Sequence, residues 1–424
     1  MSSEVGERAP RVSSGVFALG VKVVALPPPL STAERGELRA IRTRRTLEKS
    51  DAFRRQRERI LALTTAVEHG RPVAAAPRPE RRFLRAVTWN IERGNRLEAL
   101  LGFLAEQPEI RAADVVLLNE TDIGMARSGN RNVAREIADA LGLEYVFGNS
   151  YVCLSHGDTR DGTHTVDNAD GLHGNAILSR WPLRRAENFG VAITKDKFES
   201  SDKRLGHKKA LWAELETPLC MLAAVAIHLD PYASPTQRRA QMADGLAKVA
   251  ERRLGPAVLL GGDLNTTTYD LESIPRLCWN IAQKLARGGF PHAIEHYMRP
   301  HALYERRVFA ELEAHGFDYE RFNDMRTGTV RYEVGTFDSE SKVRDHLPGV
   351  VAHLLRYKLR PWGGVAPLKI DWFAGRGLTV LGQGQIGEPD GRRSLAPKVF
   401  QRARWRGQVI SDHDPILVDF VLDT

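Results

Sequence analysis

The sequence predicts an α/β fold of the α+β type, a four-layer α/β sandwich in which two packed, mixed β-sheets are flanked by helices. Three observations predict it. A chain of 424 residues is long enough for one large domain with an appendage, or for two domains. Its 42% hydrophobic and 27% charged residues are typical of a soluble globular protein. From residue 83 onward, apolar runs typical of strands dominate, some paired as in hairpins and some separated by helical stretches.

The first 80 residues are predicted to form a basic arm. Residues 1–85 hold 18 Lys and Arg against 9 Asp and Glu, whereas the rest of the chain holds 43 against 44. The formal net charge of +8 therefore belongs to the arm, and only the arm is expected to attract a polyanion. One alternative is a solvated helix that packs one apolar side on the next domain, and the other is direct contact with nucleic acid or acidic lipid.

The arm is expected to be mostly one long helix followed by a linker. Residues 1–30 look irregular, and residues 31–69 mix charges of both signs in the helical manner. Ser31 precedes Glu34 by three positions, which is the spacing of a capping box at a helix start. Residues 70–80 are rich in Ala and Pro and are predicted to be the linker.

Residues 81–424 are predicted to form the second domain. Strands are expected at residues 83–91, 114–118, 145–154, 174–179, 211–216, 221–228, 257–260 and 416–422. Helices are expected at residues 97–107, 132–141 and 235–254, and a glycine directly follows each of the last two.

Two segments of this domain are longer than ordinary connections. The polar residues 155–173 include three histidines, and a mobile solvated loop is favoured over a second metal site because the spacings match no ligand pattern. Residues 266–370 span 105 positions, too many for a structureless loop. Helical stretches at 274–286 and 303–315 predict a small subdomain, which we expect to lie over the functional site and to read the substrate.

The sequence also bounds the cellular location. No apolar run reaches the roughly 18 residues that a membrane span requires. The apolar stretch 16–30 contains Lys22 and ends in three prolines, which argues against a signal peptide. Cys153, Cys220 and Cys278 are too few and too scattered for a disulfide framework or a zinc site. A cytoplasmic location is therefore expected, with secretion as the alternative.

Seven short motifs place polar side chains after apolar runs. Phosphoester hydrolysis requires a hard cation, a base that activates water and a group that stabilises the leaving oxygen. Carboxylates, amides and imidazoles at the rim of a sheet can supply all three, although each motif alone is a weak signal. The motifs are Thr88-Trp89-Asn90-Ile91-Glu92, Leu118-Asn119-Glu120, Gly174-Asn175-Ala176-Ile177-Leu178-Ser179-Arg180, Ile227-His228-Leu229-Asp230, Gly261-Gly262-Asp263-Leu264-Asn265, Lys369-Ile370-Asp371-Trp372 and Ser411-Asp412-His413-Asp414-Pro415.

The order of these motifs resembles the endonuclease/exonuclease/phosphatase superfamily, which includes pancreatic deoxyribonuclease, exonuclease III, sphingomyelinases and inositol-phosphate 5-phosphatases. The resemblance implies that residues 81–424 are the catalytic domain, with residues 266–370 as an insertion. It also implies the four-layer sandwich, a Mg²⁺ cofactor that Mn²⁺ can replace, and attack of water on phosphorus.

For the metal, the resemblance implies that Glu120 is the principal ligand and that Asn90 supports the metal or the phosphate. Glu92 lies two positions after Asn90, on the same strand face, and is expected to add a carboxylate. Asp412 is expected to bind the metal or to support a ligand. The alternative for Glu120 is a surface charge at the sheet rim.

For catalysis, the resemblance implies that Asp263 orients or deprotonates the attacking water and that Asn265 holds the phosphate. Asp371 is expected to pair with His413, which then acts as general base or as cationic stabiliser. His228 is expected to donate a hydrogen bond to phosphate or a proton to the leaving group. Its alternative is a structural histidine.

Four residues are expected to contact substrate. Asn175 should shape or line the cleft, and Lys208 or Lys209 should offset phosphate charge, although a solvated charge run explains the two lysines equally well. Arg238 lies on a helix near the His228 loop, where the family often has Arg.

Nucleic acid is the favoured substrate, because the arm is basic and because His228 stands where deoxyribonuclease-like and sphingomyelinase-like members carry His. The 5-phosphatases usually have Trp before Gly-Asp and Arg after Asn, unlike the Gly261 and Thr266 found here. A sphingomyelinase-like lipid or small-molecule phosphoesterase is the enzymatic alternative. The other alternative is a non-catalytic nucleic-acid-binding module. DNA or RNA preference and oligomeric state are open.

Overall fold

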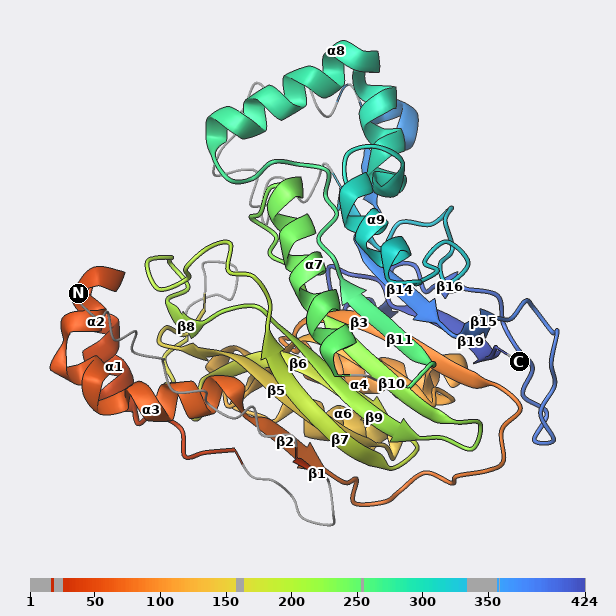
Figure 1. Ribbon diagram of the computed structural model, residues 1–424, viewed down its shortest axis with the longest axis horizontal. Helices are drawn as coiled ribbons and strands as arrows, with labels where there is room; N and C mark the ends of the chain where they lie inside the picture. The colour runs from red at the N-terminus through yellow and green to blue at the C-terminus, as the bar shows by residue number, and fades with distance from the viewer. Residues whose placement is uncertain are drawn as a thin grey trace, which may run out of the picture.

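Two mixed β-sheets pack face to face in the computed structural model, which describes residues 17–18, 26–157, 164–252, 255–333, 357 and 359–423 (Figure 1). The predicted α/β sandwich is confirmed. Each sheet combines one parallel strand pair with antiparallel neighbours, because β3 runs parallel to β4 and β10 runs parallel to β11.

The larger sheet has nine strands, and its backbone order is β15-β19-β3-β4-β6-β5-β2, with β16 pairing β19 and β8 pairing β5. Its strands are β2 (Val67–Gly70), β3 (Leu84–Arg93), β4 (Val115–Ile123), β5 (Glu144–Cys153), β6 (Leu172–Ser179), β8 (Arg204–Gly206), β15 (Leu378–Val380), β16 (Lys398–Val399) and β19 (Ile416–Leu422).

The smaller sheet has six strands in the order β1-β7-β9-β10-β11-β14. They are β1 (Phe17–Ala18), β7 (Leu183–Gly190), β9 (Lys209–Glu216), β10 (Met221–Ile227), β11 (Val258–Asp263) and β14 (Asp371–Arg376). The eight strands predicted from sequence are all present within a few residues of their expected bounds, and the two sheets gain additional strands, including β1, β2, β7, β8, β15 and β16.

The alternation of side chains along each strand builds the four layers. In β4, Val115 and Leu117 enter the core between the sheets, while Val116 and Leu118 face helices on the outer side. That outer face is covered by α4 (Leu97–Glu106) and α6 (Val133–Leu141). The outer face of the smaller sheet is covered by α7 (Pro235–Glu251) and α9 (Arg306–Ala314).

The single helix predicted over residues 31–69 is wrong. The structure has three helices, α1 (Thr32–Ala40), α2 (Arg44–Lys49) and α3 (Asp51–Thr65), followed by β2. The chain is extended at Thr43 and Ser50, and each side chain caps the helix that follows it. The capping box of Ser31 and Glu34 is confirmed.

The arm is joined to the sandwich at several points. Strand β2 pairs antiparallel with β5, so residues 67–70 belong to the larger sheet. Buried Arg35 donates to the carbonyl of Ala169 at 3.2 Å and to that of Asn168. The division of the chain near residue 80 stays a prediction about domain organisation. Apart from β1, the prediction for residues 1–25 lies outside the described residues.

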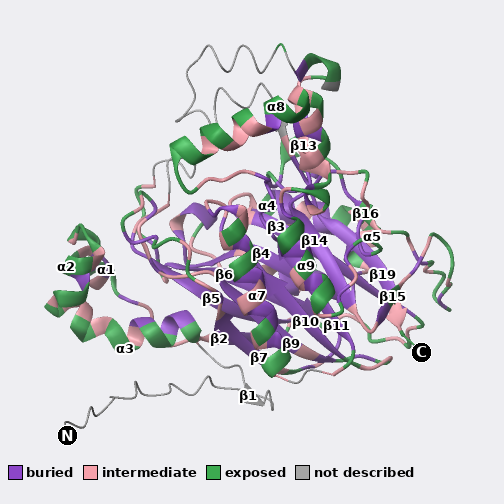
Figure 2. Ribbon diagram, turned by 45° about the horizontal axis from the view of Figure 1, so that its top comes forward, coloured by how far each residue is buried: buried purple, intermediate pink, exposed green. Residues whose placement is uncertain are grey.

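The insertion contains the two predicted helical stretches. Helix α8 (Ile274–Met298) starts as expected, continues beyond residue 286 and leaves helical geometry at Gly288 and Gly289. Short elements follow, namely η3 (Pro300–Ala302), α9, and the paired strands β12 (Val330–Glu333) and β13 (Val365–Leu368). Figures 1 and 2 show α8 standing away from the sheets, with most of its first half exposed.

Within the described ranges, none of the helices combines the length and the apolar character needed to cross a bilayer. The three cysteines are free, with Cys153 buried and Cys278 exposed. In the segment 155–173, His156 lies 3.1 Å from Asp167, whereas His173 belongs to β6 and contacts Asp122, so these two histidines bind different carboxylates.

Candidate active site

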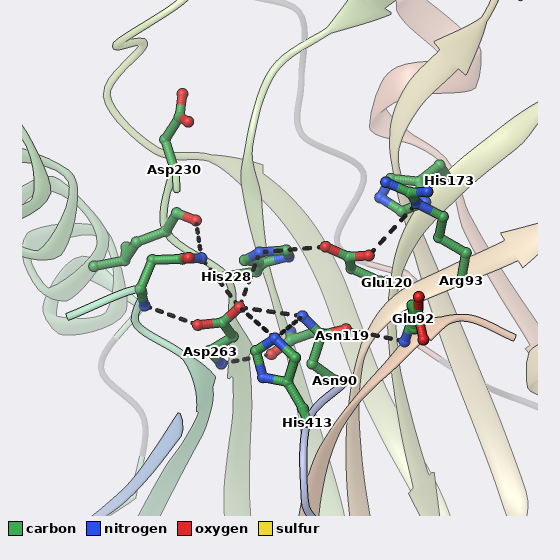
Figure 3. Close-up of polar contacts among 12 residues, drawn as sticks. Asn90, Glu92, Arg93, Asn119, Glu120, His173, His228, Asp230, Asp263 and His413 are labelled. Carbon is green, nitrogen blue, oxygen red and sulfur yellow. Dashed lines mark hydrogen bonds and ion pairs between the residues drawn. The ribbon is translucent and has the colours of Figure 1, made fainter. Parts of the chain in front are cut away.

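The topology brings six motifs to one end of the sandwich. Strands β3 and β4 run parallel, as do β10 and β11, so the carboxyl ends of each pair lie at the same end of the sandwich. Four predicted residues lie at these ends: Asn90 near the end of β3, Glu120 in β4, His228 after β10 and Asp263 at the end of β11. Strands β14 and β19 run in the opposite direction, so Asp371 and His413 arrive at the same end from strand starts. Figure 3 shows the resulting cluster.

Backbone irregularities aim the acidic side chains. The register between β3 and β4 shifts after Asn90, and that between β4 and β6 shifts after Leu118. At these shifts Glu92 has φ 46° and Glu120 has φ 54°, both in the left-handed region. Such bulges re-aim side chains and concentrate at functional sites. Glu120 therefore lies within β4, which continues to Ile123, and not at its end.

Asp371 and His413 form the predicted pair. His413 Nδ1 donates to the carboxylate of Asp371, with Oδ1 at 3.0 Å and Oδ2 at 2.8 Å. Burial alone would lower the pKa of His413, but the charges of Asp371, Asp412 and Asp263 outweigh it and raise the pKa well above its usual range. A cationic imidazole is therefore favoured, with Nε2 directed towards Asp263 Oδ2 at 3.9 Å.

Asp263 is the centre of the cluster. Its Oδ2 accepts hydrogen bonds from Asn90 Nδ2 at 3.1 Å and from Asn265 Nδ2 at 3.0 Å. His228 Nε2 lies 3.5 Å from the same oxygen. Burial and then the charge of Asp371 raise the pKa of the Asp263 carboxyl to about 7. A base whose pKa lies near neutral pH is suited to take a proton from water and release it.

An amide relay behind Asp263 was not predicted. Asn119 Oδ1 accepts from the Asp263 backbone N–H at 2.7 Å, and Asn119 Nδ2 donates to Asn175 Oδ1 at 2.9 Å. Asn175 Nδ2 in turn donates to the carbonyl of Lys209 at 2.9 Å. The amide groups of Asn175 are thus occupied by protein, and Asn175 supports the cleft from behind. The bonds of Asn119 to Asp263 and of Asn175 to Lys209 join the two sheets, so the role of Asn119 could not be predicted from its local sequence.

The two lysines differ in position, since Lys208 precedes β9 and Lys209 is the first residue of that strand. Lys208 lines a recess together with His228 and Asn175. Burial lowers the pKa of Lys208 to about 7, against the opposing charges of Glu120, Asp230 and Asp263. Burial and the charge of Lys248 lower the pKa of Lys209 to about 8, and its backbone carbonyl supports Asn175.

Arg238 does not reach this cluster, contrary to the prediction. Its buried guanidinium pairs with Glu305 of the insertion and donates to the carbonyls of Ala233 at 2.6 Å and Tyr269 at 2.8 Å. Because Nε and both terminal nitrogens are engaged, Arg238 joins α7 to the insertion.

The carboxylates beside the cluster suit a hard cation. Glu92, Glu120 and Asp412 offer oxygen ligands of the kind that Mg²⁺ prefers. Burial, the charge of Asp412 and that of Glu120 raise the pKa of Glu92 to about 7, even though Arg96 lies 2.5 Å away. Such crowding of negative charge is relieved by a bound cation. Glu120 is 3.7 Å from Arg93 Nε and 4.0 Å from His228 Nε2.

A second acidic group could also hold a cation. Ligand atoms of Asp263, Asp371 and His413 lie within 4.8 Å of one another. Asp371 is already bonded to His413 Nδ1, however, so we interpret this trio as a hydrogen-bonded relay. The metal site at Glu120 stays a prediction.

Another imidazole–carboxylate pair lies beside Glu120. His173 Nδ1 is 2.7 Å from Asp122 Oδ1, and Asp122 is held by Arg127 at 2.7 Å. Sequence reasoning placed His173 in a loop and did not mark Asp122 or Arg127. Asp122, Arg127 and His173 come from three separate segments, so no fixed spacing in the sequence indicates that they pair.

The fold and this cluster define a hydrolase of phosphoesters. Residues 87–413 match the Endonuclease/Exonuclease/phosphatase family, and the chain belongs to that family. Members of the family hydrolyse phosphoesters and generally depend on divalent metals. No curated protein was found to match the chain.

Solved structures similar to this chain include an endonuclease/exonuclease/phosphatase from Beutenbergia cavernae (16% identity, 81% of this chain and 72% of that chain, TM-score 0.46). Another comes from Bacteroides vulgatus (15% identity, 81% and 100%, TM-score 0.43). The human Nocturnin catalytic domain is 13% identical, with 80% and 93% covered and a TM-score of 0.40.

Proposed function

We propose that the protein is a Mg²⁺-dependent phosphodiester hydrolase that cleaves nucleic acid, with Mn²⁺ able to replace Mg²⁺. The observation that carries the proposal is the convergence on Asp263 Oδ2 of Asn90 at 3.1 Å, Asn265 at 3.0 Å and the imidazoles of His228 and His413 at 3.5 and 3.9 Å. A base surrounded by amide donors and a cationic imidazole is suited to phosphate chemistry.

The proposed reaction follows from these positions. Asp263 accepts a proton from water, whose oxygen attacks phosphorus as the bond to the leaving oxygen breaks. The raised pKa of His413 favours its role as cationic stabiliser of phosphate oxygens over that of base. We assign Lys208 and His228, which line one recess, to the leaving oxygen. A cation at Glu120, for which Glu92, Asp412 and Asn90 are the expected supporting residues, would neutralise phosphate charge.

The arm supports nucleic acid as the substrate. Five basic side chains on its helices and on the connection between α1 and α2 are exposed and form no ion pair with a described residue: Arg39, Arg42, Arg45, Lys49 and Arg57. Such a surface attracts a phosphate backbone without reading its sequence. The cytoplasmic location expected from the sequence remains a prediction.

A lipid or other amphiphilic phosphoester is the second candidate. The first half of α8 exposes Ile274 (56%), Trp279 (67%) and Leu285 (39%), apolar side chains whose exposure the sequence had not indicated. Exposed apolar groups of this kind suit a lipid interface. A non-catalytic binding module is disfavoured, because Glu120, Asp263 and His413 are all present and positioned.

The test is hydrolysis of single- and double-stranded DNA, RNA, sphingomyelin and an inositol phosphate with Mg²⁺, Mn²⁺ or EDTA. Wild type is compared with Glu120→Ala and with Arg276→Met, a control on the exposed face of α8. Metal-dependent cleavage of a nucleic acid that is lost only in Glu120→Ala is expected. Cleavage of sphingomyelin alone would transfer the proposal to the lipid candidate, and no cleavage at all would refute it.

A further inference from the structure

The loop that follows Asp263 contains a strained residue. Thr268 is fully buried and has φ 66°, in the left-handed region. This conformation is a genuine outlier for a β-branched residue, because Cβ branching crowds the backbone. Backbone strain persists only where the surroundings impose it, and it concentrates at functional sites. The contacts of Thr268 therefore identify what imposes it.

Two oppositely charged residues of the insertion hold Thr268. Its backbone N–H donates to Glu305 Oε1 at 3.1 Å. Its carbonyl oxygen and its Oγ1 each accept a hydrogen bond from Lys284 Nζ, both at 2.8 Å. All three polar groups of Thr268 are thus bound by Lys284 and Glu305, which we call the clamp.

The clamp is buried and fixed by its own partners. Lys284 is 1% exposed, and its ammonium lies over the ring of Tyr269 at 3.9 Å and near that of Tyr304 at 4.9 Å. Cations are stabilised over aromatic faces. Glu305 is 1% exposed and pairs with the buried guanidinium of Arg238 on α7. The clamp therefore ties α8 and the start of α9 to the body of the sandwich.

Short contacts connect the clamp with Asp263. Asn265 also has positive φ, at 48°, and its backbone N–H donates to Asp263 Oδ1 at 2.8 Å. The N–H of Thr267 donates to the carbonyl of Asn265 at 2.7 Å. Thr266 Oγ1 accepts from Trp372 Nε1 at 3.0 Å, which fixes the loop to β14. The loop is thus held by β14 in its middle and by the clamp at its far end.

We propose that Lys284 and Glu305 are positioning residues, through which the insertion holds the loop of residues 264–268 in the strained form that aims Asn265 at Asp263. The insertion then belongs to the catalytic machinery, in addition to any contact that it makes with substrate. The expected loss of turnover when the clamp is removed rests on the proposed hydrolysis, whereas the expected loosening of residues 264–268 does not.

The test compares Lys284→Met with Arg276→Met, a cation on the exposed face of the same helix. With the hydrolysed substrate at saturation, kcat of Lys284→Met should fall by about tenfold or more while KM changes by less than about twofold. Hydrogen exchange of residues 264–268 should quicken in Lys284→Met only. Adding Thr268→Gly to Lys284→Met should restore most of the lost kcat, because glycine adopts φ 66° without strain.

Two outcomes would overturn the clamp. One is a Lys284→Met variant whose kcat and loop exchange both match Arg276→Met. The other is a double variant that recovers no kcat, since a general loss of folding would not be repaired by relieving one backbone angle. A wild-type protein that hydrolyses nothing would instead refute the proposed function, and the exchange measurement alone would then decide the clamp.

Discussion

Replacing Asp371 by Asn tests the pairing of this carboxylate with His413. Both side chains are buried, and the two Asp371 oxygens lie 2.8 and 3.0 Å from Nδ1. The amide keeps the shape and removes the charge. A hydrogen bond to a charged group contributes about 1.5–3 kcal/mol. Since about 1.4 kcal/mol is a factor of ten in rate, kcat should fall by roughly 10- to 150-fold.

The same substitution should move the acidic limb of the pH–rate profile. Burial and then the charge of Asp371 raise the pKa of Asp263 to about 7. Without that charge the pKa of Asp263 falls, so the base stays deprotonated to lower pH and the acidic limb shifts downward. The assay is steady-state hydrolysis of bis(p-nitrophenyl) phosphate with Mg²⁺ between about pH 5 and pH 9, a range that brackets this pKa.

The matched control is Asp318→Asn, a half-exposed carboxylate that caps the N–H of Arg321 at 3.1 Å. Its kcat and pH profile should equal those of wild type. If Asp371→Asn kept the wild-type kcat and the wild-type acidic limb, the His413–Asp371 pair would have no role in turnover and the reasoning would be refuted.

Four further expectations follow from buried or exposed charges. Asp263→Asn should abolish turnover in the hydrolysis assay, because an amide cannot accept a proton from water; substantial residual turnover would remove Asp263 from the role of base. Glu305→Gln should cost about 3–5 kcal/mol in urea unfolding, because it leaves the charge of Arg238 buried without its partner; a loss under about 1 kcal/mol would contradict this reading. The pKa of Lys284 is lowered to about 7 by burial, so the folded state binds fewer protons than the unfolded state between about pH 7 and pH 10. The difference in unfolding free energy between wild type and Lys284→Met should therefore rise with pH from about pH 7 to pH 10. A difference that does not change with pH would contradict the lowered pKa of Lys284. Arg57→Ala should weaken DNA binding equally for all sequences and reduce the salt slope by about 1, whereas an unchanged slope would remove Arg57 from the interface.

The sequence was sufficient for the fold and for the centre of the site. Asn90, Asp263 and His413 were predictable because each lies at or near the end of an apolar strand, and neighbouring strands bring such ends together. Their positions depend only on the apolar pattern of each strand and on the order of the strands in the sheets. Strand β7 was missed because its Arg184, Arg185 and Glu187 interrupt the apolar alternation that marks a strand.

Other features depended on partners far along the chain. Arg238 lies on a helix near His228, but Glu305, 67 positions later, binds its guanidinium. Asn119 acquires its role from the N–H of Asp263 in the other sheet. The break of the arm helix at Thr43 and Ser50 depends on two extended residues inside a stretch whose charge pattern is helical throughout. Pairings across such distances leave no periodic trace in the sequence.

Strand β2 also has a consequence for assembly. By pairing with Tyr145–Gly148, residues 67–70 cover part of the hydrogen-bonding edge of β5. An uncovered edge strand offers a row of free N–H and C=O groups to another molecule. Removal of the arm through residue 70 would thus expose the N–H and C=O groups of β5 that β2 now binds. Limited proteolysis between β2 and β3 would be tolerated only as long as the cleaved piece stayed in place, and its dissociation would favour self-association.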